Sequence, residues 1–210
     1  MTEKRIALFG GTFDPVHLGH TVVAAAAGEQ TGAEKVIFVP AKRSPLKVFF
    51  PEAGDEDRLA MAGLALAGNK GFDISDYELK KTGPSYTLET VIHFQQQYGE
   101  DTAIYWLAGA DAVEDLQHWY GIAELIDRCN LSVMFRAGFS PPDFSRFESV
   151  WGSERVRRLQ ASVIETPLID VSSTEIRKRL SAGRDVSGMV SPKVLQYIRE
   201  HGLYGYKAEE

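Results

Sequence analysis

FGGTFDPVHLGH, residues 9–20, joins an apolar run to a run of small residues. The apolar run, KRIALF (4–9), predicts a buried strand, and the segment from residue 19 to about 31 predicts a helix. Gly10 and Gly11 allow a sharp turn and a close approach of a ligand to the main chain, because glycine has no Cβ. Since amide groups at a helix N-terminus bind phosphate, this order of elements is compatible with a phosphate site, although two glycines after a strand fit a plain tight turn equally well. It matches neither the Walker nor the GxGxxG pattern.

The rest of the chain alternates in the same way. Further strands are predicted at 35–40, 72–79, 102–109 and 131–136, and further helices at 55–68, 85–98, 173–182 and from 191. Prolines and glycines predict surface loops at 41–54 and 137–152. The alternation predicts an α/β fold with a doubly wound, mainly parallel sheet, whose ligands bind beyond the carboxyl ends of the strands. We expect a single domain over residues 1–210, with a small C-terminal helical part at about 172–205.

Composition restricts the class of protein. Apolar residues make up 44% of the 210 residues, which is enough for a sizeable core, and the net charge of −6 argues against nucleic-acid binding. No apolar stretch approaches the length of a membrane span, and MTEKRIALF lacks the apolar region of a signal peptide, so we expect a cytoplasmic protein that does not bind membranes. The single cysteine, Cys129, is expected to be a buried thiol.

His17 and His20 sharpen the prediction, because two residues three apart at a helix start can face the same side. They could be metal ligands, although no third histidine or cysteine is near. They could be structural histidines with satisfied hydrogen bonds. Alternatively they bind phosphate, since an imidazolium offers two donors and a positive charge. The glycine turn beside them favours phosphate.

A second candidate phosphate site is DVSSTEIRKRL, residues 170–180, which opens a later helix. Ser172 and Glu175 have the spacing of a capping box, and this simple interpretation is compatible with a functional one. Ser173, Thr174 and Arg177 add two hydroxyl groups and a guanidinium at the same helix end. Two helix N-termini with such donors could hold one polyphosphate.

GGTFDPVHLGH resembles the signature of the HxGH nucleotidyltransferase superfamily, which implies a Rossmann-like nucleotidyltransferase fold. The resemblance implies that His17, His20 and Arg177 are catalytic, stabilising charge on the ATP phosphates as pyrophosphate leaves. The sequence VSSTEIR is similar to the motif of that superfamily that supports the ATP triphosphate. The residues that the resemblance assigns to ATP binding are Gly10, Gly11, Thr12, Phe13, Arg136, Ser173 and Thr174. For Arg136, a surface arginine is the alternative.

Three further segments resemble the bacterial nicotinate-nucleotide adenylyltransferases, so that the resemblance runs from about residue 5 to 205. They are KKTGPSYTLETV (80–91), LAGADAVEDLQHWY (107–120) and SPKVLQYIREHGLYG (191–205). The resemblance assigns mononucleotide binding to Lys47, Ser85, Tyr86, Thr87, Asp111, Trp119 and Tyr120. Thr87, Trp119 and Tyr120 would hold the nicotinate carboxylate, Trp119 would stack on the pyridine ring, and Asp111 would bind ribose. Leu46 stands where that family usually has histidine, which leaves the contacts of the loop open.

Simpler structural roles compete for several of these residues. Ser85 and Asp111 could be helix caps, and Trp119 could be an ordinary core or surface tryptophan. Asp14 is interpreted as a turn residue and not as a catalytic one. No protein cluster of metal ligands is expected.

The reaction implied by the resemblance joins ATP and nicotinate mononucleotide to give deamido-NAD and pyrophosphate, in NAD biosynthesis, with Mg²⁺ carried mainly by the ATP phosphates. Three alternatives remain open. The acceptor could be nicotinamide mononucleotide or phosphopantetheine, or the protein could be a nucleotide sensor without catalysis. A dinucleotide-dependent oxidoreductase would need a glycine fingerprint that this chain lacks. The sequence leaves the oligomeric state open, a homo-oligomer included.

Overall fold

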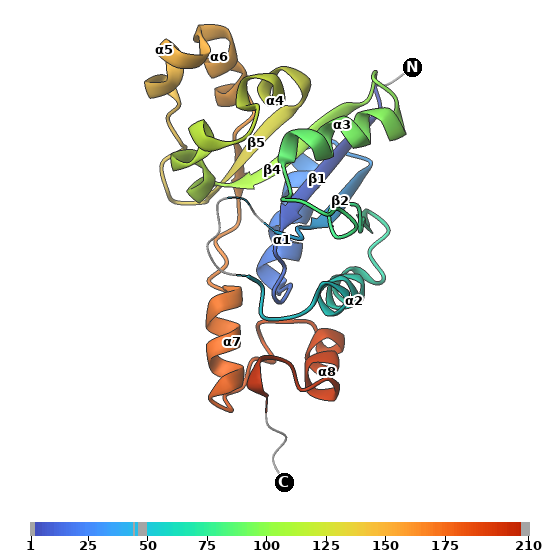
Figure 1. Cartoon of the computed structure of the whole chain (residues 1–210). Coiled ribbons are helices and arrows are strands. Elements are labelled where there is room, and N and C mark those ends of the chain that lie inside the picture. Colours follow the sequence, from blue (N-terminus) through green and yellow to red (C-terminus); the bar gives the residue numbers. More distant parts are fainter. Residues whose placement is uncertain (1–2, 44, 46–49, 207–210) are drawn as a thin grey trace.

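The computed structural model of the chain describes residues 3–43, 45 and 50–206. In this part of the chain, six parallel strands form one sheet in the order β3-β2-β1-β4-β5-β6 (Figure 1). The α/β class and the doubly wound, parallel sheet are confirmed. The strands are β1 (Arg5–Gly11), β2 (Lys35–Pro40), β3 (Phe72–Ile74), β4 (Ala103–Gly109), β5 (Asn130–Arg136) and β6 (Ile164–Thr166).

Helices cover both faces of the sheet. This is required because successive side chains of a strand point to opposite faces, and both sets are buried here. In β1, Ala7 belongs to the core beneath α1 and α2, while Leu8 belongs to the opposite core beneath α3, α4 and α6. The helices are α1 (Leu18–Thr31), α2 (Asp55–Leu66), α3 (Thr87–Tyr98), α4 (Ile122–Arg128), α5 (Glu148–Trp151), α6 (Ser153–Ala161), α7 (Ser173–Ser181) and α8 (Pro192–Glu200). Short 3₁₀ turns occur at Ala110–Glu114, Leu116–His118, Ser145–Phe147 and Leu203–Gly205.

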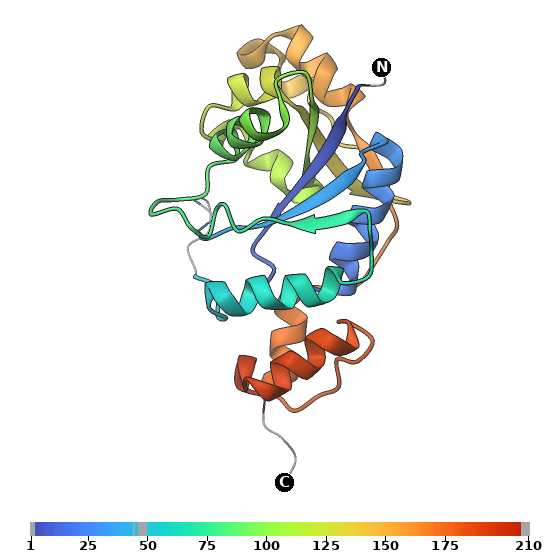
Figure 2. The same cartoon turned by 90° about the vertical axis from the view of Figure 1, so that its right-hand side faces the viewer.

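The C-terminal helices α7 and α8 lie beyond α2, at the end of the molecule to which the carboxyl end of β1 leads (Figures 1 and 2). The side chain of Tyr197 in α8 donates a hydrogen bond to Asp57 of α2 at 3.0 Å, and Ile176 and Leu180 of α7 join the core on the α1–α2 face. The expected C-terminal helical part is therefore packed against the core on the α1–α2 face, and α7 contacts the turn that follows β1.

The sheet has its topological switch point between β1 and β4. From β1 the chain passes through α1 to β2 on one side, whereas β4 pairs with the other side of β1. Loops that leave these two strands diverge to opposite faces and open a crevice at the carboxyl ends. The glycine turn after β1 and the loop after β4 both start from this edge.

Two sequence predictions are wrong in detail. The strand predicted at 72–79 ends at Ile74, because Pro40 at the end of its partner β2 has no N–H to continue the ladder; the chain then turns, with Lys80 N donating to Asp76 O. The loop predicted at 137–152 contains the helix α5, whose Trp151 is buried in the core. The elements α4, α6 and β6 were not predicted.

Candidate active site

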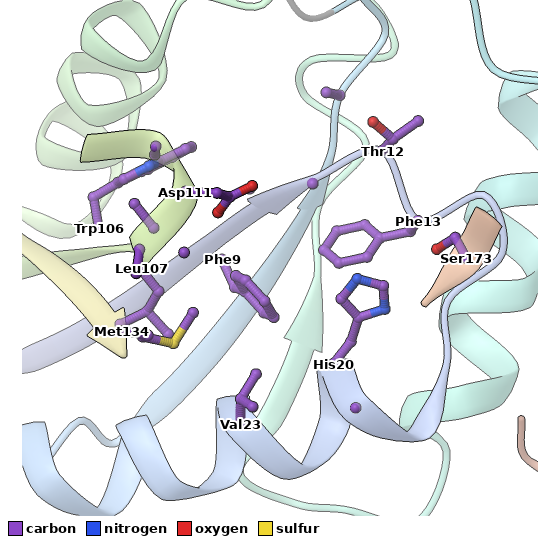
Figure 3. A pocket seen from close by; sticks show the side chains of 18 of the residues that line it. Phe9, Thr12, Phe13, His20, Val23, Trp106, Leu107, Asp111, Met134 and Ser173 are labelled. Atoms are coloured by element: carbon purple, nitrogen blue, oxygen red, sulfur yellow. The ribbon is translucent and has the colours of Figure 1, made fainter. Parts of the chain in front are cut away.

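A cavity of about 1120 Å³ opens at the carboxyl ends of β1, β4 and β5 (Figure 3). It collects every predicted site residue that the structure describes, from segments throughout the chain. From the glycine turn and α1 come Gly10, Gly11, Thr12, Phe13, His17 and His20; from later segments come Ser85, Tyr86, Thr87, Asp111, Trp119, Tyr120, Arg136, Ser173, Thr174 and Arg177. Lys47 lies outside the described residues, as does Leu46.

Gly10 and Gly11 are required by close packing on the floor of the cavity. A Cβ on Gly10 would lie 2.4 Å from Cζ2 of Trp106, and a Cβ on Gly11 would lie 2.9 Å from the ring of Phe13. Phe13 itself adopts φ 49°, in the left-handed region, and is buried between Phe9 and Phe38. The two glycines therefore allow aromatic rings to fill the space directly beneath the ligand site.

His17 and His20 form a reciprocal cap at the start of α1. The backbone N–H of His20 donates to Nδ1 of His17 at 3.3 Å, and the N–H of His17 donates to Nδ1 of His20 at 3.2 Å. Their rings stack with centroids 3.6 Å apart. Because each Nδ1 accepts a backbone hydrogen bond, the neutral form of each ring carries its proton on Nε2.

The expected positive charge on His17 is wrong for the free protein. Its side chain is 8% exposed, and burial lowers its pKa from 6.5 to about 4. At neutral pH it is an uncharged imidazole that offers one N–H donor instead of two donors and a charge. Figure 3 shows the His20 ring next to that of Phe13, with centroids 5.0 Å apart, on the wall of the cavity.

The start of α7 is tied directly to the glycine turn. Ser172 caps the helix by accepting a hydrogen bond from Glu175 N at 3.2 Å, as predicted, although the Glu175 side chain pairs with Arg179. Ser173 Oγ donates to the carbonyl oxygen of Pro15 at 2.9 Å. The two segments proposed to hold one polyphosphate therefore meet at one end of the cavity.

Arg177 and Asp14 complete this junction. The guanidinium of Arg177 donates to the carbonyl oxygen of Asp14 at 2.8 Å and to Glu52 Oε1 at 2.6 Å. The carboxylate of Asp14 is buried and accepts hydrogen bonds from the backbone N–H of Glu52 and Ala53 and from the hydroxyl of Tyr204. Asp14 thus joins three segments, in agreement with its interpretation as a turn residue.

The predicted acceptor residues line the same cavity. Thr87 is the first residue of α3, and the ring centroids of Tyr86 and Tyr120 lie 4.8 Å apart. Ser85 does not cap the helix: its Oγ accepts a hydrogen bond from the N–H of Lys42 at 3.1 Å. Asp111 lies inside the turn that follows β4 and is not its N-cap residue, which is Gly109. Both capping alternatives are therefore wrong.

Some cavity residues were not predicted. Trp106 comes from β4 and lies against Gly10, while Glu78 comes from the turn mistaken for a strand, and Phe139 follows β5. A tryptophan within a buried strand gives no sign of lining a cavity. Glu78 is 2% exposed, which its sequence neighbours do not indicate.

The described residues contain no group of three or more histidine, cysteine or acidic side chains able to hold a metal ion. The carboxylate oxygens of Asp14 are occupied by protein donors. These side chains suit a cation that arrives already bound to oxygen ligands better than a cation that the protein alone would bind. Over the same residues, none of the helices has the length and apolar character of a membrane span.

Residues 8–179 match the family model described as cytidylyltransferase-like. A protein of Rhodopirellula baltica named "probable nicotinate-nucleotide adenylyltransferase" is 38% identical over 199 residues, covering 95% of this chain and 92% of that protein. One of the same name from Neisseria meningitidis serogroup B is 38% identical, with 96% and 98% covered. The solved nicotinic acid mononucleotide adenylyltransferase of Plasmodium falciparum, complexed with NaAD, has the same fold, with TM-score 0.72, 18% identity, and 98% and 100% covered.

Proposed function

The chain belongs to the cytidylyltransferase-like family, and from this premise we propose that it transfers the adenylyl group of ATP to nicotinate mononucleotide, giving deamido-NAD and pyrophosphate in NAD biosynthesis. The observation that carries the proposal is that two segments predicted to bind phosphate, joined by the hydrogen bond from Ser173 to Pro15, line the same cavity as an aromatic, hydroxyl-bearing turn. A volume of about 1120 Å³ is large enough for a dinucleotide.

At the nucleotide end, the triphosphate would lie against the N-termini of α1 and α7. Gly10, Gly11, Thr12 and Phe13 would contact ATP through the turn. From α7, Ser173 would donate through its backbone N–H, because its hydroxyl is bound to Pro15, and Thr174 would donate beside it. Arg136, at the exposed end of β5, would contribute a positive charge at the rim. The hydrogen bond between Ser173 and Pro15 supports this arrangement because it fixes α7 against the turn.

The chemical step needs no general base. The phosphate oxygen of the mononucleotide is already ionised and would attack the α-phosphorus of ATP, and the bond from that phosphorus to the bridging oxygen would break as pyrophosphate leaves. His17, His20 and Arg177 would stabilise the charge that develops on the phosphates. Because both imidazoles are held by their Nδ1 atoms, their Nε2 donors are oriented before ATP binds.

Magnesium would enter with ATP, held mainly by phosphate oxygens and water, and would supply neutralisation of phosphate charge. The carboxylate of Asp14 already accepts hydrogen bonds from protein donors, which supports a magnesium ion held by ATP and not by a cluster of protein ligands.

At the acceptor end, Trp119 would stack on the pyridine ring and Asp111 would accept hydrogen bonds from ribose. The hydroxyl of Thr87 and the backbone amides at Trp119 and Tyr120 would bind the nicotinate carboxylate. Lys47 would meet phosphate. Neutral donors suit an anionic carboxylate, since they stabilise it without requiring a buried counter-charge.

ATP supply in the cell supports a cytoplasmic site of action, which we include in the proposal.

The test of the whole proposal is pyrophosphate release by the purified protein with Mg²⁺, ATP and either nicotinate or nicotinamide mononucleotide. We expect the acid to react faster. Faster reaction of the amide would contradict the roles of Thr87 and the 119–120 turn, and ATP binding without pyrophosphate release from any acceptor would indicate a nucleotide sensor.

A further inference from the structure

Glu78 is a buried acid that the proposed reaction does not use. It lines the cavity beside the acceptor turn, residues 85–87, yet only 2% of its surface is exposed. Its Oε1 accepts a hydrogen bond from Thr90 Oγ1 at 2.6 Å, and its carboxylate also accepts one from the hydroxyl of Ser85. Burial raises its pKa, while these two hydroxyl donors lower it.

Three segments meet at this carboxylate. Ser85 Oγ, which donates to Glu78, accepts from the N–H of Lys42, and Ser85 N donates to the carbonyl oxygen of Arg43 at 2.9 Å. The loop after β2 is thereby attached to the acceptor turn. Thr90, which is fully buried in α3, connects the first turn of that helix to the same carboxylate.

The other charged groups around Glu78 do not compensate its burial with a close ion pair. Lys81 lowers the pKa of Glu78 through space, but its ammonium group pairs with Glu89, which raises that pKa. A buried carboxylate held mainly by hydroxyl groups is costly compared with an apolar side chain of similar size. Stability alone is therefore a weak reason for an acid at this position.

We propose that Glu78 is a positioning residue for the acceptor: it fixes the backbone of Ser85, Tyr86 and Thr87 through the hydroxyl groups of Ser85 and Thr90, and so determines the affinity for the pyridine mononucleotide. This inference rests on the proposed function. The hydrogen-bond partners of Glu78 are Ser85 and Thr90, neither of which is assigned to ATP binding, so we assign Glu78 no contact with the reacting atoms. Its effect is expected on acceptor binding and not on ATP binding.

Three substitutions separate this role from a general loosening of the fold. Glu78→Ala removes both acceptors, and we expect the KM for nicotinate mononucleotide to rise about tenfold or more, since two hydrogen bonds are lost. Glu78→Gln keeps the shape and an acceptor for Thr90, so it should restore most of the affinity. Thr90→Val removes one donor without changing the volume and should raise the same KM about threefold. The KM for ATP should stay within about twofold in all three.

Thr102→Val is the matched control. Thr102 is also a buried threonine, 6% exposed, and its hydroxyl donates a hydrogen bond to Tyr98 O at 2.9 Å. Unlike Glu78, it does not line the cavity. It should lower the melting temperature without changing either KM. Binding of nicotinate mononucleotide, followed by quenching of tryptophan fluorescence, gives a second readout that does not need turnover. If Glu78→Ala does not fold, Glu78→Gln and Thr90→Val carry the test.

The outcomes distinguish the two proposals. A wild-type protein that neither binds nicotinate mononucleotide nor releases pyrophosphate with it overturns the proposed function, and the role of Glu78 with it. A wild-type protein that does both, while Thr90→Val and the foldable Glu78 variants keep an unchanged acceptor KM, overturns only the role of Glu78. Equal rises in the KM for ATP and for the acceptor would also overturn it, because they would show a structural effect.

Discussion

The guanidinium of Arg177 donates a hydrogen bond of 2.8 Å to the carbonyl oxygen of Asp14, a residue 163 positions earlier in the chain. This contact joins the turn that precedes α1 to α7, the two segments that the sequence suggested as halves of one phosphate site. It also holds the arginine in the cavity before any ligand arrives, so that little side-chain entropy remains to be lost on binding.

Replacing Arg177 by alanine should lower turnover by about 10² while leaving the fold intact, because a charged donor to the phosphates is lost. Arg177→Lys should recover only part of the rate, since lysine lacks the planar fork. Arg179→Ala is the matched control: Arg179 lies on the same helix, pairs with Glu175 and does not line the cavity. Steady-state pyrophosphate release measures all three, and equal rates for Arg177→Ala and Arg179→Ala would contradict the assignment.

His20→Ala should also reduce turnover by about 10² or more, because the Nε2 donor of His20 would no longer stabilise the negative charge that develops on the phosphates. The same change removes half of the reciprocal cap of α1, so the melting temperature must be measured beside the rate. Normal turnover in a folded His20→Ala protein would remove the catalytic role of this residue.

Most of the fold followed from patterns that the chain displays locally. The runs at β1, β2, β4 and β5 are long, apolar and followed by turn residues, and each proved to be a parallel strand. The failures have local causes as well. β6 has three residues, too few to show a period, and α6, SERVRRLQA, buries only Leu159, so its polar sequence gives no apolar stripe.

The sequence predicted many of the residues that meet in the cavity, but not their electrostatics. Short motifs named residues that meet in one cavity, because each motif lies at a strand end or a helix start. The neutral state of His17 depends on its burial, and the role of Asp14 depends on Tyr204, 190 residues away. Such properties come from contacts between distant segments, which no local pattern contains.

Trp119→Ala should raise the KM for the mononucleotide by about 2- to 13-fold, which corresponds to the free energy of one ring-stacking contact. Trp119→Phe should have a smaller effect, since a flat aromatic face remains. The KM for ATP should be unchanged in both, because Trp119 lies on the segment that follows β4 and not on the segments assigned to ATP. A loss of ATP affinity equal to the loss of mononucleotide affinity would argue against stacking on the pyridine ring.

Gly10→Ala should destabilise the protein by about 1–3 kcal/mol, because the new Cβ would overlap the ring of Trp106 at 2.4 Å in a packed wall. Gly63→Ala provides the opposite control. Gly63 lies within α2 with nothing near its Cβ position, so alanine should stabilise by about 0.5–1 kcal/mol. Urea unfolding of the two variants measures both effects. A stabilised Gly10→Ala protein would show that Trp106 moves away without cost.

The buried His17 also predicts how stability depends on pH. Its pKa is lowered to about 4 in the folded protein and is near 6.5 in the unfolded chain. The unfolded chain therefore takes up a proton in the window between these values while the folded protein does not. The contribution of His17 is present in full above about pH 6.5 and is lost as the pH falls toward 4.

Between pH 7 and pH 5 this single group should cost the wild-type protein about 2 kcal/mol of unfolding free energy. His17→Asn removes the titrating ring but keeps a side-chain acceptor for the N–H of His20, as a good N-cap residue does. The two proteins share all other titrating groups. Between pH 7 and pH 5, the His17→Asn protein should therefore lose less unfolding free energy than the wild type, by the amount that His17 contributes. Urea unfolding of both proteins at the two pH values measures the difference, and an equal loss in both would show that His17 is protonated in the folded protein at pH 5.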